Sequence, residues 1–139
     1  MAVRKTADSL SACNDIINNL KAGQIAPVYL LMGEESYYID LLTSELQNSL
    51  LKPEERDFNL LTMFGAETDV ATVMNAARGF PMGAQRLVVC VHEAARLSNI
   101  EQLVLYLKKP QPSTVLIICY KYGRMDGRNK LINAIKQCG

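Results

Sequence analysis

Continuous apolar runs alternate with longer amphipathic stretches along this chain. Three of these runs are strongly apolar, and a shorter candidate lies between the first two. Runs without polar alternation are typical of strands buried on both faces, as in a parallel sheet. The four predicted strands cover residues 27–33, 58–64, 86–91 and 114–119.

Apolar residues at helical spacing predict five amphipathic helices around these strands. Capping residues, glycines and prolines set their limits. The first predicted helix covers 6–22 before Gly23, and the second has an apolar stripe from Ile39 to Leu50 before Pro53. The third begins at Asp69 and ends at Gly79. The fourth begins at a Ser98–Glu101 capping box, and the fifth is capped by Asp126. A helix therefore separates each pair of strands. This order predicts right-handed crossovers onto one largely parallel sheet with helices on both faces, an α/β fold.

The chain of 139 residues, 49% of them hydrophobic and 21% charged, has the size and composition of one globular domain. We therefore expect residues 1–139 to form a single domain. Its net charge of +1 excludes the chain-wide basic field of sequence-independent DNA binding. No apolar stretch is long enough for a membrane span, and residues 1–8 lack the apolar core of a secretory signal peptide. These features predict a cytoplasmic protein without a membrane partner.

The cysteines and the single histidine predict no metal site. Cys13, Cys90, Cys119 and Cys138 lie far apart without a C-x-x-C pair, which is typical of reduced cytosolic thiols that act as small hydrophobes. His92 follows the third strand beside one carboxylate, and both a metal site and a catalytic relay need further convergent groups. We expect no metal, no cofactor and no catalytic residue in this domain.

The residues after the first strand are the place to look for nucleotide binding, because ligands bind beyond the carboxyl ends of parallel strands. A phosphate-binding loop starting at Gly33 would read G-x-x-x-x-G-K-[ST]. Here Tyr38 stands in place of the second glycine, Ile39 replaces the lysine, and Asp40 follows. Two glutamates also follow Gly33 directly, where they would face the phosphates. The pattern predicts a loop that does not bind phosphate.

Residues 79–83 read Gly-Phe-Pro-Met-Gly in a turn between a helix and a strand. Apolar side chains at a loop tip either insert into a partner's pocket or fold back onto the core. Phe80 and Met82 are the two side chains for which these alternatives matter.

Cations are dense between Lys108 and Lys136, where Asp126 is the only carboxylate. A solvated helix face and a contact with phosphates or an acidic partner are both consistent with such a run. The candidate residues for a contact with DNA or a subunit are Lys121, Arg124, Arg128 and Lys130.

Three stretches together resemble the N-terminal domain of the delta subunit of the bacterial DNA polymerase III clamp loader. They cover residues 27–35, 78–89 and 106–117, and their order and spacing match across nearly the whole chain. Residues 33–40 are similar in style to delta subunits of Bacteroidetes-type bacteria. The resemblance implies a degenerate AAA+ domain, a RecA-like α/β fold of the P-loop type that has lost its nucleotide site.

The resemblance also implies a function in DNA replication. In this family the domain binds the ring-shaped sliding clamp and helps open it for loading onto primed DNA, while sister subunits hydrolyse ATP. The clamp-binding wedge usually carries a leucine–phenylalanine pair. By the register of the following strand, that pair falls on Pro81 and Met82, with Phe80 adjacent. This chain departs from the usual pair, so which of the three residues fills the clamp pocket stays open.

Family members continue into a lid and a collar domain, which we expect to be absent from these 139 residues. The collar holds the subunit in the loader assembly, where DNA is also bound. The whole holoenzyme is a DNA-directed DNA polymerase, a nucleotidyltransferase, although no catalysis is expected from this domain.

Two other functions remain open from the residues alone. One is a P-loop-like nucleotide-binding domain or NTPase with a divergent loop. The other is a signalling module of the receiver type, which needs an acidic cluster and a phosphoacceptor aspartate at strand ends. No aspartate directly follows the predicted strand ends, which are Met32, Phe64, Val91 and Cys119.

Overall fold

The computed structural model describes residues 17–19, 21–23, 25–33 and 36–121. These residues contain a four-stranded sheet in the order β1-β4-β3-β2, and every neighbouring pair is parallel. The strands are β1 (Val28–Gly33), β2 (Leu60–Phe64), β3 (Leu87–His92) and β4 (Thr114–Lys121). This confirms the α/β fold and the parallel sheet that the apolar runs predict.

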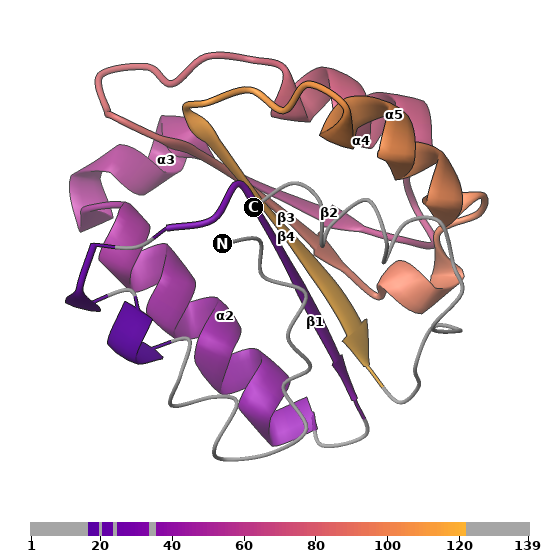
Figure 1. Cartoon of the computed structure of the whole chain (residues 1–139), viewed down its shortest axis with the longest axis horizontal. Helices are drawn as coiled ribbons and strands as arrows, with labels where there is room; N and C mark the ends of the chain where they lie inside the picture. The colour runs from indigo at the N-terminus through magenta and orange to yellow at the C-terminus, as the bar shows by residue number, and fades with distance from the viewer. Residues whose placement is uncertain (1–16, 20, 24, 34–35, 122–139) are drawn as a thin grey trace.

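Helices cover both faces of the sheet (Figure 1). On one face lies α2 (Ser36–Leu50), and on the other lie α4 (Val70–Ala77) and α5 (Val104–Leu107). The shorter elements are η1 (Pro53–Glu55), α3 (Arg56–Asn59), η2 (Ala94–Arg96) and η3 (Ile100–Leu103). None of the helices among the described residues combines the length and the apolar content of a membrane span.

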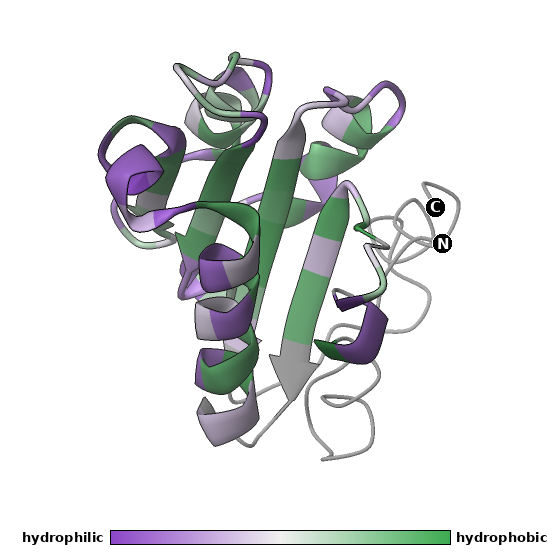
Figure 2. Ribbon diagram, turned by 90° about the vertical axis from the view of Figure 1, so that its left-hand side faces the viewer, coloured by the Kyte–Doolittle hydropathy of each residue, from purple (hydrophilic) through white to green (hydrophobic). Residues whose placement is uncertain are grey.

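The sheet separates two hydrophobic cores, because alternate residues of a strand point to opposite faces. In β3, Val89 and Val91 pack toward α4 and α5, whereas Val88 and Cys90 pack toward α2. A strand with a core on each side needs apolar residues at every position, and the central strands are hydrophobic along their length (Figure 2). This is why the sequence shows continuous apolar runs here.

Two predicted boundaries are confirmed by local geometry. Asp69 caps α4, where its side chain accepts a hydrogen bond from the Thr72 backbone N–H at 2.7 Å. Gly23 has a φ of +80°, the left-handed conformation expected at the end of a helix. The rest of the predicted helix over 6–22 lies largely outside the described residues, and the helix capped by Asp126 lies wholly outside them.

The predicted start of the second strand is wrong. Phe58 belongs to the short helix α3, and β2 begins at Leu60. The side-chain amide of Asn59 donates to the Glu55 carbonyl at 2.9 Å, which holds the chain in a helical turn up to that residue. The apolar side chain of Phe58 therefore belongs to a turn, not to the strand.

The predicted capping box of Ser98 and Glu101 is also wrong. The residue that caps the next element is Asn99, which adopts a left-handed conformation with a φ of +57° and makes no side-chain capping bond. Asparagine tolerates this conformation better than most residues, so the chain turns there. The helix predicted in this region consists of η3 followed by a single turn, α5.

Gly65, directly after β2, leaves no room for a side chain. A Cβ added there would lie 2.1 Å from the Glu93 carbonyl oxygen and 2.9 Å from the Leu97 backbone nitrogen. Both neighbours are backbone atoms and cannot rotate away. We expect Gly65→Ala to lower the free energy of unfolding by about 2 kcal/mol, in the range for overpacked sites. Urea unfolding followed by circular dichroism measures this, and an unchanged midpoint would contradict the predicted overlap.

Candidate functional site

The loop between α4 and β3 presents two large apolar side chains to solvent. We call residues 79–86 the tip loop. In it Phe80 is 76% exposed and Met82 is 65% exposed, while Pro81 between them is half-buried. Neither Phe80 nor Met82 folds back onto the core, so of the two alternatives that the sequence leaves open, the exposed arrangement is the one present.

A buried asparagine holds the centre of the tip loop. Asn59 is only 1% exposed, and its side-chain amide donates to the Met82 carbonyl at 2.9 Å. The Met82 N–H donates to the Asn59 side-chain oxygen at 2.6 Å. These paired bonds fix the backbone of Met82 as a neighbouring strand would, while its side chain stays in solvent. The folded domain itself therefore holds the Met82 backbone in place.

The start of the tip loop is anchored from the opposite side. The Gln111 side chain donates to the Arg78 carbonyl at 3.1 Å, directly before the loop. The hydroxyl of the buried Tyr106 accepts from the Gln111 backbone N–H at 3.1 Å and lies 3.5 Å from the Ala77 carbonyl. The loop is thus fixed both at its centre and where it leaves α4.

The tip loop lies at the edge of the sheet where the strands begin. It leads into β3, and α3 leads into β2 at the same edge, near the loop in Figure 1. Phe58 of α3 is 67% exposed and directly precedes Asn59. A third exposed aromatic or thioether side chain therefore belongs to this edge. β1 ends and α2 begins at the opposite edge, where the parallel strands end.

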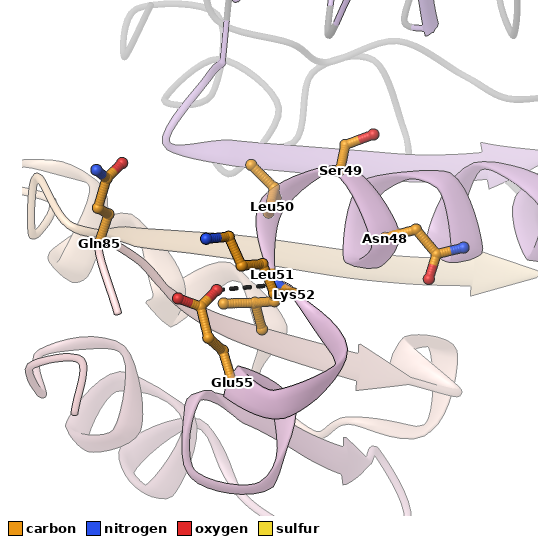
Figure 3. Close-up of a pocket in the computed structure, with 7 residues that line it drawn as sticks. All are labelled: Asn48, Ser49, Leu50, Leu51, Lys52, Glu55 and Gln85. Atoms are coloured by element: carbon orange, nitrogen blue, oxygen red, sulfur yellow. Dashed lines mark hydrogen bonds between the residues drawn. The ribbon is translucent and has the colours of Figure 1, made fainter. Parts of the chain in front are cut away.

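Two hollows lie beside the end of the tip loop that leads into β3. One, of about 280 Å³, lies between the end of α2, η1 and Gln85 of the loop, and Figure 3 shows Gln85 reaching it from a segment apart from the other residues. Two residues that line this hollow are hydrogen-bonded: the Lys52 backbone N–H donates to the Glu55 carboxylate at 2.9 Å. The other, of about 320 Å³, includes Arg86 and three prolines in its lining. The last two residues of the tip loop, Gln85 and Arg86, therefore each line one hollow.

The predicted phosphate-loop positions lie at the other edge of the sheet. Gly33 ends β1, and Ile39 is a residue of α2 that is fully buried in the core between this helix and the sheet. Tyr38 is half-buried with its ring edge-on to Tyr37 at a centroid distance of 5.4 Å, and Asp40 is exposed. Ile39 contributes to the core at the position where a phosphate loop has its lysine.

The four predicted contact cations cannot be placed as side chains. Lys121 is the last residue of β4, and only its backbone is described. Arg124, Arg128 and Lys130 lie outside the described residues. Their contact with DNA or a neighbouring subunit stays a prediction.

Sequence reasoning missed Phe58 and Asn59 as parts of this site. The apolar run predicts a strand at Phe58, although its position between two polar residues, Asp57 and Asn59, is a signal for an exposed turn. No sequence signal pairs Asn59 with Met82, because they are 23 residues apart and their bonds involve the Met82 backbone.

Known proteins resemble this chain over most of its length. The family model for the DNA polymerase III delta subunit matches residues 29–138. The DNA polymerase III subunit delta of Bacillus subtilis strain 168 is 29% identical over 133 residues, covering 88% of this chain and 38% of that protein. The solved structure of the Bacillus subtilis DNA clamp loader delta protein is 28% identical with a TM-score of 0.81, covering 91% of this chain and 40% of that one.

The chain thus spans about two fifths of the length of these relatives. Both relatives come from Bacillus subtilis, so the similarity to the Bacteroidetes type stays a prediction. The family match covers well over half of the chain and agrees with the observed parallel sheet. This chain belongs to the DNA polymerase III delta subunit family.

Proposed function

We propose that this chain is the clamp-binding domain of a clamp loader delta subunit, and that its tip loop inserts into an apolar pocket of the sliding clamp. The observation that carries the proposal is the exposure of Phe80 and Met82 on a loop whose backbone is fixed by Asn59. A fold rarely leaves two large apolar side chains in solvent on an ordered loop unless another surface covers them.

The free energy gained by burying Phe80 and Met82 is large enough for them to anchor a partner. Complete burial of a phenylalanine or methionine side chain is worth about 1.5–3 kcal/mol relative to full exposure. Two such side chains supply several kcal/mol, which offsets part of the cost of association. The half-buried Pro81 between them keeps the loop stiff, so little further entropy is lost on binding.

Clamp opening by this domain needs no ATP hydrolysis within it. A protein that binds the open ring more tightly than the closed ring shifts the equilibrium by its differential affinity alone. We propose that the edge around Gly33 is a degenerate nucleotide site. The burial of Ile39 supports this, because no cation occupies the position from which a phosphate loop neutralises its ligand.

The proposed partners follow from the same function. The sliding clamp binds the tip loop, and the other clamp loader subunits bind through lid and collar domains. DNA is held in the assembled complex, where Lys121, Arg124, Arg128 and Lys130 are the candidate contacts. The proposal places the protein in the cytoplasm, in DNA replication.

The direct test is calorimetric titration of this chain into the sliding clamp of the same organism. We expect saturable binding, with one chain for each tip-loop pocket of the clamp. No other clamp loader subunit needs to be present in the titration. Because the collar domain is not needed for this contact, co-elution in gel filtration should give the same result. Absence of both heat and co-elution at tens of micromolar protein would overturn the proposal.

A second titration separates this function from that of a divergent NTPase. We expect a fluorescent ATP analogue with Mg²⁺ to show no saturable binding to the chain, because the lysine position is an isoleucine buried in the core. Saturable micromolar binding would instead favour the nucleotide-binding alternative. The clamp titration and the nucleotide titration have independent outcomes, so either function can fail alone.

A further inference from the structure

Three metal-ligating side chains meet beneath α2, at the edge of the sheet opposite the tip loop. Cys90, His92 and Cys119 each offer one ligand atom, and these atoms all lie within 4.8 Å of one another. Both cysteines are buried, and His92 is half-buried. Among the described residues, these three side chains form a cluster whose ligand atoms lie close enough together to hold one metal ion.

The sheet itself brings these side chains together. Cys90 and His92 are two residues apart on β3, so they point to the same face. The register pairs Val91 of β3 with Ile118 of β4, and its continuation places Cys119 opposite His92. The cluster therefore rests on the rigid central strands, where small shifts of the backbone are least expected.

The spacing suits a tetrahedral thiophilic ion. With metal–sulfur bonds of about 2.3 Å and a metal–nitrogen bond of about 2.0 Å, ideal tetrahedral angles place the sulfur and nitrogen about 3.5 Å apart. The Cys90 sulfur and the His92 Nε2 lie 3.5 Å apart. Little rearrangement is needed to receive an ion between them.

Neighbouring side chains orient two of the three ligands. The Phe64 ring stacks on the His92 imidazole at a centroid distance of 5.4 Å and an interplanar angle of 26°. The Thr43 hydroxyl lies 3.3 Å from the Cys119 sulfur and donates to the Ile39 carbonyl at 2.7 Å. Such outer contacts fix the direction of a ligand and are a regular part of metal sites.

We propose that Cys90, His92 and Cys119 form a binding site for a thiophilic cation of the Zn²⁺ class. Two sulfurs and one imidazole nitrogen are the ligand types such an ion prefers, and three protein ligands leave a fourth position for water. Each thiol that coordinates as a thiolate releases its proton to solvent. The half-buried His92 gives the ion a route from the sheet edge. This site is separate from the tip loop and independent of clamp binding.

Zinc competition with a chelating dye tests the site on the full chain. We expect about one Zn²⁺ per chain, and Co²⁺ in its place should give thiolate charge-transfer absorption. Cys119→Ser and His92→Asn should each weaken zinc binding at least about 100-fold, since each removes a direct ligand.

The matched control removes the other two cysteines. The double variant Cys13→Ser with Cys138→Ser should bind Zn²⁺ like the parent chain and keep the cobalt absorption. Circular dichroism of each metal-free variant checks folding, and His92→Asn decides the outcome if Cys119→Ser does not fold. Equal zinc binding in His92→Asn and the parent chain, loss of binding in the control variant, or no binding by the parent chain would each overturn the site.

Discussion

Replacing Phe80 and Met82 together with alanine is expected to weaken binding to the sliding clamp about 100-fold. Each truncation removes most of an exposed apolar side chain, and anchors of this kind contribute about 1.5 kcal/mol or more when a partner buries them. A combined loss of about 3 kcal/mol corresponds to a factor of at least about 100 in Kd. The Tm should stay nearly unchanged, because neither side chain packs in the folded chain. Calorimetric titration and thermal unfolding measure the two effects.

Two exposed apolar residues elsewhere on the molecule serve as matched controls. Tyr37 is 66% exposed at the opposite edge of the sheet, and Leu105 is 55% exposed on α5. Tyr37→Ala and Leu105→Ala should leave clamp binding unchanged. Equal losses in these controls would indicate non-specific apolar contact. A large drop in the Tm of the double variant would show instead that Phe80 and Met82 stabilise the fold.

The single variants identify the side chain that fills the clamp pocket. If Phe80 alone is the anchor, Phe80→Ala should account for nearly the whole loss and Met82→Ala should be close to neutral. Phe58→Ala measures whether the third exposed side chain at this edge also contacts the clamp. These outcomes test which side chains of the proposed clamp-binding loop contact the clamp.

Most of the fold was predictable because three of the four strands in the described sheet are buried on both faces. That burial requires apolar residues at every position, so β1, β3 and β4 appear in the sequence as uninterrupted runs. Residues that end an element, such as Gly33 at the end of β1, are also visible in the sequence, because their effect depends only on their own backbone. Short elements are less visible. The single turn α3 has no hydrophobic periodicity, so Phe58 reads as the start of a strand.

The candidate sites were less predictable because they depend on contacts distant in sequence. The Gly-Phe-Pro-Met-Gly pattern marks an apolar tip, but the choice between exposure and burial depends on Asn59, which holds the Met82 backbone. Cys90 and Cys119 read as small hydrophobes because nothing local pairs them. Only the parallel register of β3 and β4 brings them next to His92.

Asn59→Ala is expected to lower the free energy of unfolding by about 3 kcal/mol. It removes three hydrogen bonds that the buried side chain makes, two with Met82 and one with the Glu55 carbonyl. Each is worth about 1 kcal/mol net. Asn75, an exposed asparagine on α4, gives the matched control, since Asn75→Ala should leave stability nearly unchanged.

The same variant separates loop order from side-chain chemistry. Phe80 and Met82 are intact in Asn59→Ala, but the loop must be ordered again when the clamp binds. Fixing one residue costs about 1–2 kcal/mol, so clamp affinity should fall about tenfold at a temperature well below the Tm. Hydrogen exchange at the Met82 amide should accelerate as well, because its N–H loses its acceptor. Faster exchange with unaltered clamp affinity would mean that the exposed side chains act without a preformed loop.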